Sequence, residues 1–385
     1  MQTFWTVLLG LLALVWVVQS VRLFFGMRSL PRLGEAPPLA EADCPSISVL
    51  FSARDEQEKL PRALATMLAQ DYPRYEVIAV DDRSTDATGR ILDESAARDP
   101  RLKVTHIAEL PAGWLGKPHG LQRAFEASSG EWLVCTDADV RLAPDLLRCA
   151  VGVASKRGWD HLTVFGKVDM FGFWERVLVT HFFFGGSLVL EFWRVSNPKS
   201  NRFAGAGMFQ LVRRSAYEAS GTHRRLAMEV LDDMKLGKII KRAGFRSGVT
   251  GMDDRVAVRW NDGAANIIRG LEKNMFAAAY FSAWLALAAQ LLLVLLLSPL
   301  AALFHFPVSS WAWTFAAAAA AAPALGQAMT CIQRGVSPLY GLTYPLGLLM
   351  FGYAVANSTM KTLRQGGVRW RDTFYPLEQL RKGLV

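Results

Sequence analysis

The sequence predicts an α/β domain built on a mostly parallel, Rossmann-like sheet, with membrane-spanning segments on both sides of it in the chain. Two observations support this prediction. Between Ser46 and Asp137, short apolar runs alternate with single helical patterns, as in βαβ units. Apolar residues make up 51% of the 385 residues, and they gather near the two ends of the chain, as membrane anchors around a water-exposed body do.

The body begins with four expected strands and three expected helices. We expect the strands at residues 46–51, 76–80, 102–107 and 132–136. We expect the helices at residues 60–69, 85–97 and 118–128, with Ser84 as the N-cap of the second helix. Ligands of such sheets bind beyond the carboxyl ends of the strands. The residues that follow each strand are therefore the candidates for a site.

Acidic residues follow three of these strands. Asp55 comes after the first, Asp81 and Asp82 after the second, and Asp137 and Asp139 after the fourth. One Asp-rich turn is usually only a turn with a helix cap, but three at equivalent strand ends indicate a site. An Asp-x-Asp pair suits Mg²⁺ or Mn²⁺, with a substrate diphosphate completing the coordination. Neither glycine-rich phosphate-loop pattern follows a strand, which argues against dehydrogenases and P-loop NTPases.

The N-terminal segment is expected to be a transmembrane anchor, residues 1–27. Residues 3–25 are almost wholly apolar, and about 20 such residues cross a bilayer. Met1 to Thr3 carry no charged side chain, whereas Arg22, Arg28 and Arg32 come late in the run or after it. This order differs from that of a cleaved signal peptide. It predicts an outer N-terminus and a cytoplasmic domain at residues 44–265.

Three more apolar stretches, residues 276–304, 311–332 and 338–356, lie in a predicted membrane block at residues 266–360. Three crossings would place the tail, residues 361–385, outside the cell. The positive-inside rule instead favours the cytoplasm, because the tail has six basic residues: Lys361, Arg364, Arg369, Arg371, Arg381 and Lys382. On that second interpretation one stretch is re-entrant or interfacial, and both interpretations stay open. Residues 177–193 predict either a membrane-surface helix or a core segment.

The charge of the chain indicates a membrane rather than a nucleic acid as its partner. The net charge is +9, but the Lys and Arg residues form no basic stripe with interleaved aromatics, and many flank apolar segments. Such cations interact with an anionic leaflet. The four cysteines form no C-x-x-C pair, so we expect free thiols and no zinc site.

The motifs together resemble those of the family 2 glycosyltransferases, whose catalytic domain has the GT-A fold. The similar segments stand in the family's order between Pro45 and Trp260: Ser52–Glu56, Asp81–Ser84, Gly113–Lys117, Thr136–Val140, Gly205–Phe209 with Arg213 and Tyr217, and Asp232–Leu236. The resemblance implies a role for several residues. Ser52 and Asp55 would lie near the nucleobase of the donor, and Asp82 would contact it where it is a uracil. Lys117 would lie near the diphosphate of the donor.

The same resemblance implies the catalytic residues. Asp139 and Asp137 would bind Mg²⁺ or Mn²⁺, with Asp137 also near the donor. Asp233 would be the general base, with Asp232 among the substrate-binding residues. One of these two adjacent aspartates could instead cap the helix that follows.

The sequence departs from the processive members of the family, which carry Gln/Arg-x-x-Arg-Trp. Here the segment Val256–Trp260 has Val at the first position, which argues against polymer synthesis. Arg259 would still face the diphosphate and Trp260 the acceptor, unless the pair only packs on the sheet. Residues 270–274 and 366–375 are similar to non-processive members acting on hopanoids, carotenoids or ceramide-like lipids.

The resemblance therefore implies inverting, metal-dependent transfer of one sugar from a UDP- or GDP-sugar to a lipid hydroxyl, at the cytoplasmic face of the cell membrane. Three alternatives stay open: transfer to polyprenyl phosphate, processive polysaccharide synthesis, and an inactive membrane scaffold. Intact Asp82, Asp137, Asp139 and Asp233 argue against the scaffold.

Overall fold

The structure is a computed structural model that describes residues 2–36 and 39–385. It divides into two compact units. The sheet unit contains Leu30–Asp169, Phe192–Trp260 and Glu378–Val385. The helical unit contains Met1–Ser29, Met170–Glu191 and Asn261–Leu377. Each unit is thus assembled from separate parts of the chain.

The sheet unit is built on an eight-stranded sheet with the order β3-β2-β1-β4-β7-β6-β8-β5. Its strands are β1 Ile47–Ala53, β2 Tyr75–Asp82, β3 Leu102–Ile107, β4 Trp132–Cys135, β5 Arg141–Leu142, β6 His161–Val168, β7 Gln210–Arg213 and β8 Ser247–Val258. The pairs β1–β2, β2–β3, β1–β4 and β6–β8 are parallel. The pairs β4–β7, β6–β7 and β5–β8 are antiparallel. The predicted α/β class with a mostly parallel sheet is confirmed.

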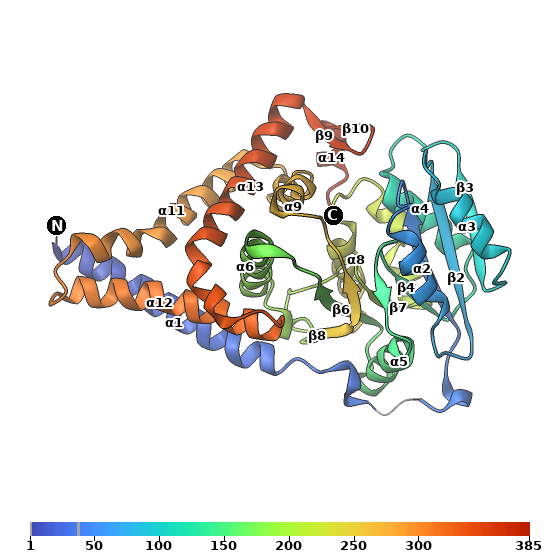
Figure 1. Ribbon diagram of the computed structural model, residues 1–385, viewed down its shortest axis with the longest axis horizontal. Helices are drawn as coiled ribbons and strands as arrows, with labels where there is room; N and C mark the ends of the chain where they lie inside the picture. The colour runs from blue at the N-terminus through green and yellow to red at the C-terminus, as the bar shows by residue number, and fades with distance from the viewer. Residues whose placement is uncertain (1, 37–38) are drawn as a thin grey trace. The chain divides into compact units, whose positions relative to one another are not determined.

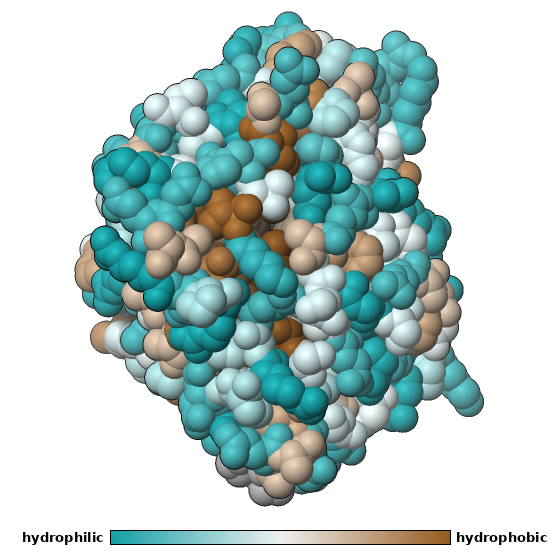
Figure 2. Space-filling view, turned by 90° about the vertical axis from the view of Figure 1, so that its right-hand side faces the viewer, coloured by the Kyte–Doolittle hydropathy of each residue, from teal (hydrophilic) through white to brown (hydrophobic). Residues whose placement is uncertain are grey.

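Helices pack on this sheet through apolar faces. They are α2 Leu60–Leu68, α3 Thr88–Ala96, α4 Gly116–Glu126, α5 Leu146–Arg157, α7 Arg214–Ser220, α8 Asp232–Arg242 and α14 Leu377–Lys382, with short 3-10 turns η1 Leu33–Glu35, η2 Glu41–Asp43, η3 Phe192–Arg194 and η4 His223–Leu226. In α2 the buried residues Leu60, Ala63, Leu64 and Met67 recur at helical spacing and form one apolar stripe. The face shown in Figure 2 is mostly hydrophilic, with apolar atoms confined to small patches.

The predicted strands and the first three predicted helices match observed ones, with shifts at the ends. Strand β2 extends through Asp81 and Asp82, so these residues end the strand rather than follow it. The predicted N-cap Ser84 is wrong: α3 begins at Thr88 after Ala87. The hydroxyl of Ser84 instead accepts a hydrogen bond from the Asp55 N–H in the loop after β1.

The helical unit contains α1 Gln2–Arg28, α6 Gly172–Leu190, α9 Ala264–Leu271, α10 Met275–Ala278, α11 Ala283–His305, α12 Trp311–Gln333, η5 Pro338–Thr343 and α13 Tyr344–Gln365, followed by the hairpin β9 Gly367–Trp370 and β10 Thr373–Pro376. Within the described residues, four helical segments are long and apolar enough to cross a membrane: Gln2–Arg28, Ala283–His305, Trp311–Gln333 and Pro338–Gln365. Figure 1 shows α1 and α12 side by side.

Two segments of this unit differ from the sequence prediction. The stretch 276–304 is not one helix, because Tyr280 and Phe281 adopt positive φ between α10 and α11, and the Ser282 hydroxyl accepts a hydrogen bond from Leu285 N–H to start α11. The stretch 177–193 lies in and just after α6, which buries Val177, Leu178 and Phe184.

Candidate active site

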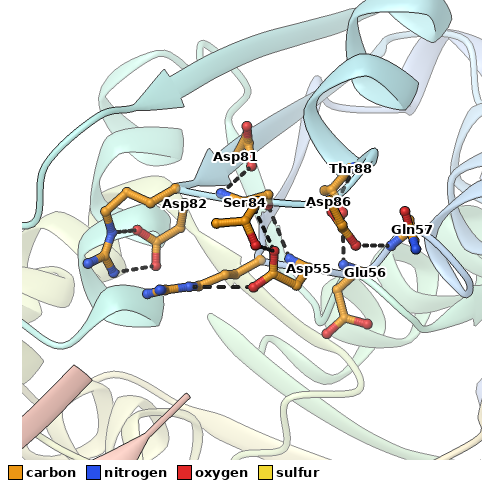
Figure 3. A network of polar contacts seen from close by, with 11 residues as sticks. Asp55, Glu56, Gln57, Asp81, Asp82, Ser84, Asp86 and Thr88 are labelled. Atoms are coloured by element: carbon orange, nitrogen blue, oxygen red, sulfur yellow. Dashed lines mark hydrogen bonds and ion pairs between the residues drawn. The ribbon is translucent and has the colours of Figure 1, made fainter. Parts of the chain in front are cut away.

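The loops after β1 and β2 are joined by hydrogen bonds (Figure 3). Asp55 has a left-handed backbone with φ 52°, which brings its side chain to the second loop. Its Oδ1 accepts hydrogen bonds from the Thr85 N–H at 2.7 Å and the Thr85 hydroxyl at 3.2 Å. Its own N–H donates to the Ser84 hydroxyl at 3.1 Å. The two loops therefore form one rigid rim at the carboxyl ends of the strands.

Asp82 is the last residue of β2, and its carboxylate is already hydrogen-bonded. The guanidinium of Arg83 donates to both carboxylate oxygens, Nε to Oδ1 at 2.8 Å and Nη2 to Oδ2 at 3.1 Å. The first residue of α4 is Gly116, where a Cβ would lie 2.3 Å from Asp82 Oδ2. One turn later, a Cβ at Gly120 would lie 2.2 Å from the Ser52 hydroxyl. Both glycines allow α4 to approach these side chains, and Ser52, Asp55 and Asp82 gather where the sequence predicted them.

Lys117 and three aspartates form the charged centre of the site. The Lys117 ammonium lies 2.6 Å from Asp137 Oδ1 and 3.9 Å from Asp232 Oδ2. Burial lowers the pKa of Lys117, but the negative charges of Asp137, Asp232 and Asp233 outweigh that effect and hold the pKa above its ordinary value. Lys117 is therefore a permanent cation next to the acidic residues after β4.

Gly207 connects Asp137 with Asp233. The Asp137 N–H donates to the Gly207 carbonyl at 2.8 Å, and the Gly207 N–H donates to Asp233 Oδ2 at 2.9 Å. Asp233 Oδ1 accepts a second hydrogen bond, from the Met234 N–H at 2.7 Å. A Cβ at Gly207 would lie 2.4 Å from Asp137 Oδ2. Only glycine therefore allows the two acidic motifs to approach this closely.

Asp139 is paired with Lys59, a residue that none of the sequence motifs marks. The Lys59 ammonium contacts Asp139 Oδ2 at 3.1 Å and also donates to the carbonyls of Arg259 at 3.1 Å and Trp260 at 3.3 Å. Burial raises the pKa of Asp139, as does the charge of Asp137, and Lys59 partly offsets both. Lys59 has no local sequence signal, because its three partners come from distant parts of the chain.

The end of β8 thus lies close to Asp139 through its main chain. The guanidinium of Arg259 donates to the carbonyl of Asp169 at 2.7 Å, and Asp169 is also ion-paired with Arg141 at 2.5 Å. Arg259 and Trp260 reach the site through their main-chain carbonyl groups, which accept hydrogen bonds from Lys59. The predicted contacts of their side chains with diphosphate and acceptor stay a prediction.

Asp232 lies on the buried side of the site beside His223, a histidine that belongs to no motif of the sequence. His223 Nε2 is 3.9 Å from Asp232 Oδ2, and His223 Nδ1 is hydrogen-bonded to the Tyr217 hydroxyl at 2.5 Å. Burial lowers the pKa of His223 to about 3, and Lys117 adds to this effect, so His223 is neutral. Asp232 is 3% exposed and lies between Lys117 and His223, whereas Asp233 is only partly buried.

The oxygen donors at this site fit a divalent cation that arrives with a substrate. In residues 2–36 and 39–385, no group of three or more His, Cys, Asp and Glu side chains could hold a metal ion by itself. Asp137 and Asp139 each pair with a lysine, so both carboxylates lie beside a positive charge. Mg²⁺ typically binds one or two protein carboxylates together with substrate phosphates. The residues present match that arrangement.

Residues 48–221 match the model of Glycosyl transferase family 2. The chain is 31% identical over 188 residues to a beta-monoglucosyldiacylglycerol synthase of Synechocystis sp. (strain ATCC 27184 / PCC 6803 / Kazusa), covering 45% of this chain and 39% of that protein. A synthase with the same name from Nostoc sp. (strain PCC 7120 / SAG 25.82 / UTEX 2576) is 32% identical over 109 residues, 28% of this chain and 23% of that protein. The match to these two relatives therefore spans less than half of their length.

The structure is similar to a mannosyltransferase from Pyrobaculum calidifontis solved in complex with GDP-Man and Mn²⁺. The TM-score is 0.56 at 22% sequence identity, over 91% of this chain and 99% of that one. This likeness confirms the GT-A type of the predicted fold. Asp232, Asp233 and Arg259 lie beyond the segment 48–221 that the family model matches.

Proposed function

Because residues 48–221 match the model of glycosyl transferase family 2, we propose that the chain belongs to this family and that it transfers a single sugar from a nucleotide diphosphate sugar to a hydroxyl group of a membrane lipid. The proposal includes inversion at the sugar carbon and a requirement for Mg²⁺ or Mn²⁺. The sheet unit would act at the cytoplasmic face of the cell membrane, where its donor is available.

The observation that carries the proposal is the arrangement of Lys117, Asp137 and Asp233 around Gly207. A cation and an acidic motif lie side by side at 2.6 Å, as needed to bind a diphosphate together with a metal. On the other side of the same glycine, Asp233 is held by two main-chain N–H groups. The proposed donor site and the proposed base would thus be adjacent, which a scaffold would not require.

The chemistry assigns one task to each group. Ser52, Asp55 and Asp82 would bind the nucleoside, and Lys117 would bind the diphosphate. Asp137 and Asp139 would hold the divalent cation, which when bound neutralises charge on the diphosphate. Asp233 would accept the proton of the lipid hydroxyl as its oxygen bonds to the sugar carbon. The bond from that carbon to the diphosphate breaks, and the nucleoside diphosphate leaves.

A lipid acceptor is supported by two independent facts. The relatives from Synechocystis and Nostoc are named as synthases of a glucosyldiacylglycerol, and this chain has four candidate membrane spans. A neutral hydroxyl acceptor needs a base, whereas an already ionised polyprenyl phosphate does not. The carboxylate of Asp233, partly exposed and oriented by main-chain donors, favours the hydroxyl.

The proposal is tested with the purified full chain in liposomes. We would incubate it with labelled UDP-glucose, UDP-galactose, UDP-N-acetylglucosamine or GDP-mannose, and with the lipids of its host. One donor should give a labelled lipid that forms only with Mg²⁺ or Mn²⁺, and the new anomeric centre should have the inverted configuration by NMR. Label in polyprenyl phosphate or in an insoluble polymer would replace this proposal with one of the alternatives. No turnover of any nucleotide sugar would overturn it.

A further inference from the structure

We infer that the helical unit crosses the membrane three times, through α1, α11 and α12, and that α6 and α13 instead lie against the lipid leaflet on the side of the sheet unit. Although the segment Pro338–Gln365, which contains η5 and α13, is long and apolar enough to span a bilayer, we assign it no crossing. The inference concerns topology and a lipid-contacting surface, and it does not depend on the reaction proposed above.

The first step is that α1 and α12 run parallel. Leu9, near the start of α1, packs with Ala312 and Ala316 at the start of α12. Farther along both helices, the Ser20 hydroxyl donates to the carbonyl of Ala322 at 3.0 Å. Two parallel neighbouring helices that both cross do so in the same direction. We call the side of the membrane that holds the sheet unit the near side and the opposite side the far side. If α1 runs from the far side to the near side, α12 does too.

The second step is that α11 runs in the opposite direction. Ala302, near the end of α11, belongs to the same cluster as Leu9 and Ala312. The end of α11 therefore meets the starts of α1 and α12, joined to α12 by the short loop 306–310. Helices α11 and α12 form an antiparallel hairpin whose loop lies on the far side with the N-terminus.

The third step is that the chain after α13 returns to the sheet unit. Residues 378–385 belong to that unit, and a main-chain oxygen of Val385 accepts hydrogen bonds from Lys235 at 2.7 Å and Lys238 at 2.6 Å. Its N–H donates to the buried Glu229 at 3.2 Å. Both ends of the segment 261–377 are thus fixed to one water-exposed unit. Only an even number of crossings between them is possible, so the α11–α12 hairpin leaves none for α13.

The side chains of α13 agree with this count. Its second half carries Asn357, Ser358 and Lys361, and all three contact Glu272: Asn357 Nδ2 at 3.0 Å, the Ser358 hydroxyl through the Glu272 carbonyl, and Lys361 as an ion pair. Glu272 lies between the last strand of the sheet unit and α11, on the near side of the membrane. The end of α13 is therefore on the near side as well.

The same reasoning applies to α6. Asp169 before it and Phe192 after it both belong to the sheet unit, where Asp169 N–H donates to the Val258 carbonyl at 2.9 Å and the Phe192 ring packs on Phe165. A helix of 19 residues is about 28 Å long and cannot cross a bilayer and return. Phe171, just before the helix, and Trp174, in its first turn, are instead 65% and 55% exposed, as aromatic residues of interfacial helices are.

This topology removes a conflict in the sequence analysis, where three C-terminal crossings would place the basic tail outside the cell against the positive-inside rule. With α13 on the near side, the basic residues Lys361, Arg364, Arg369 and Arg371 lie on the same side as the sheet unit. The positive-inside rule predicts that placement for residues close to membrane helices. The exposed aromatic start of α6 suits a membrane interface, and the basic end of α13 suits an anionic lipid leaflet.

The experiment is cysteine labelling of the full chain in intact cells with a membrane-impermeant maleimide, before and after permeabilisation. Three single variants report on the three connections: Ser309→Cys between α11 and α12, Gln333→Cys at the end of α12, and Glu378→Cys after the hairpin. Arg90→Cys on the sheet unit marks the near side. The wild type, whose four cysteines are buried, gives the background.

We expect Ser309→Cys to be labelled in intact cells, and the other three variants only after permeabilisation. Labelling of Glu378→Cys in intact cells would mean that α13 crosses, and labelling of Gln333→Cys would mean that α12 does not. Protection of Ser309→Cys would mean that the hairpin does not cross. Each of these results overturns the inference. If a variant does not accumulate, trypsin digestion of wild-type inverted vesicles replaces it, and cleavage after Arg369 or Arg371 in those vesicles alone is the expected result.

Discussion

Asp137 and Asp233 are hydrogen-bonded to the two sides of one glycine. The Asp137 N–H donates to the Gly207 carbonyl at 2.8 Å, and the Gly207 N–H donates to Asp233 Oδ2 at 2.9 Å. A single peptide segment thus sets the distance between the proposed metal ligand and the proposed base. On the Asp137 side the bond joins two main-chain atoms. On the other side it fixes the Asp233 carboxylate itself, so Gly207 orients the proposed base relative to the segment that carries the proposed metal ligand.

Gly207→Ala is therefore expected to reduce sugar transfer at least about tenfold. The added Cβ would lie 2.4 Å from Asp137 Oδ2, so the carboxylate or the segment must shift, and displacements of this size at a reacting centre cost on the order of 10²-fold. Initial rates at saturating donor measure the effect. Gly185→Ala is the matched control, because its Cβ would meet nothing within 4 Å, and it should retain full activity. Equal rates for the two variants would show that Gly207 does not set the geometry.

Removal of the Asp139 carboxylate tests whether this residue binds the proposed divalent cation. Asp139→Ala should lower kcat by about 10²–10³, the typical cost of losing one stabiliser of developing charge. It should also weaken binding of Mn²⁺ in the presence of UDP or GDP, measured by electron paramagnetic resonance without any turnover. Asp71→Ala is the control, since Asp71 is an exposed carboxylate paired with Arg148 at 3.3 Å. Unchanged Mn²⁺ binding in Asp139→Ala would contradict its role as a ligand.

Glu76 should make the stability of the sheet unit depend on pH in the acid range. Burial raises the pKa of Glu76, but hydrogen bonds from Lys103, Ser48 and Ser129 outweigh it and lower the pKa from 4.5 to about 2. A carboxyl with a depressed folded pKa stabilises the fold above its unfolded pKa, and this contribution is lost as the pH falls from about 4.5 to about 2.

Thermal unfolding in detergent between pH 6 and pH 3 would measure this contribution. Glu76→Gln should lower stability by about 1–3 kcal/mol at neutral pH, because it removes the negative charge that strengthens the hydrogen bonds from Lys103, Ser48 and Ser129. The difference from wild type should shrink as the pH approaches 3. A difference that stays constant over this range would show that the ionised carboxylate is not the stabilising form.

The sequence was sufficient for β1 to β4 and for the acidic residues at their carboxyl ends, because both follow local rules. The expectations for Lys117, Asp232 and Asp233 came from the family resemblance instead. Apolar runs mark β1 to β4, and the polar residues at their carboxyl ends must meet at one edge of a parallel sheet. That rule alone is enough to place Asp55, Asp82 and Asp137 at a common site.

What the sequence did not reveal depends on contacts between distant segments. Lys59 meets Asp139 because β1 pairs with β4, which brings the segments after these two strands together. His223 meets Asp232 through the packing of η4 on α8. The break between α10 and α11 falls on Tyr280 and Phe281, which carry none of the Gly or Pro signals of a turn. The return of residues 378–385 to the sheet unit likewise has no local pattern.

The last prediction concerns the base. Asp233→Asn keeps the size of the side chain and an oxygen that can accept the Gly207 N–H bond, but it removes the carboxylate that would accept the proton. A positioned general base contributes about 10²–10⁴-fold, so kcat should fall by that factor. The affinity for the nucleoside diphosphate, measured by calorimetry, should stay near that of the wild type, because Ser52, Asp55, Asp82 and Lys117 are unchanged.

Asp232→Asn is the matched control and separates the two adjacent aspartates. Asp232 is buried beside Lys117 and His223, so its loss removes a compensating charge and should lower thermal stability. Its effect on kcat should be smaller than that of Asp233→Asn. A helix-capping role for Asp233 predicts the opposite result, with about 1 kcal/mol of lost stability and little lost activity. If Asp233→Asn transfers sugar at nearly the wild-type rate while Asp232→Asn does not, the base is Asp232 and its assignment to Asp233 is wrong.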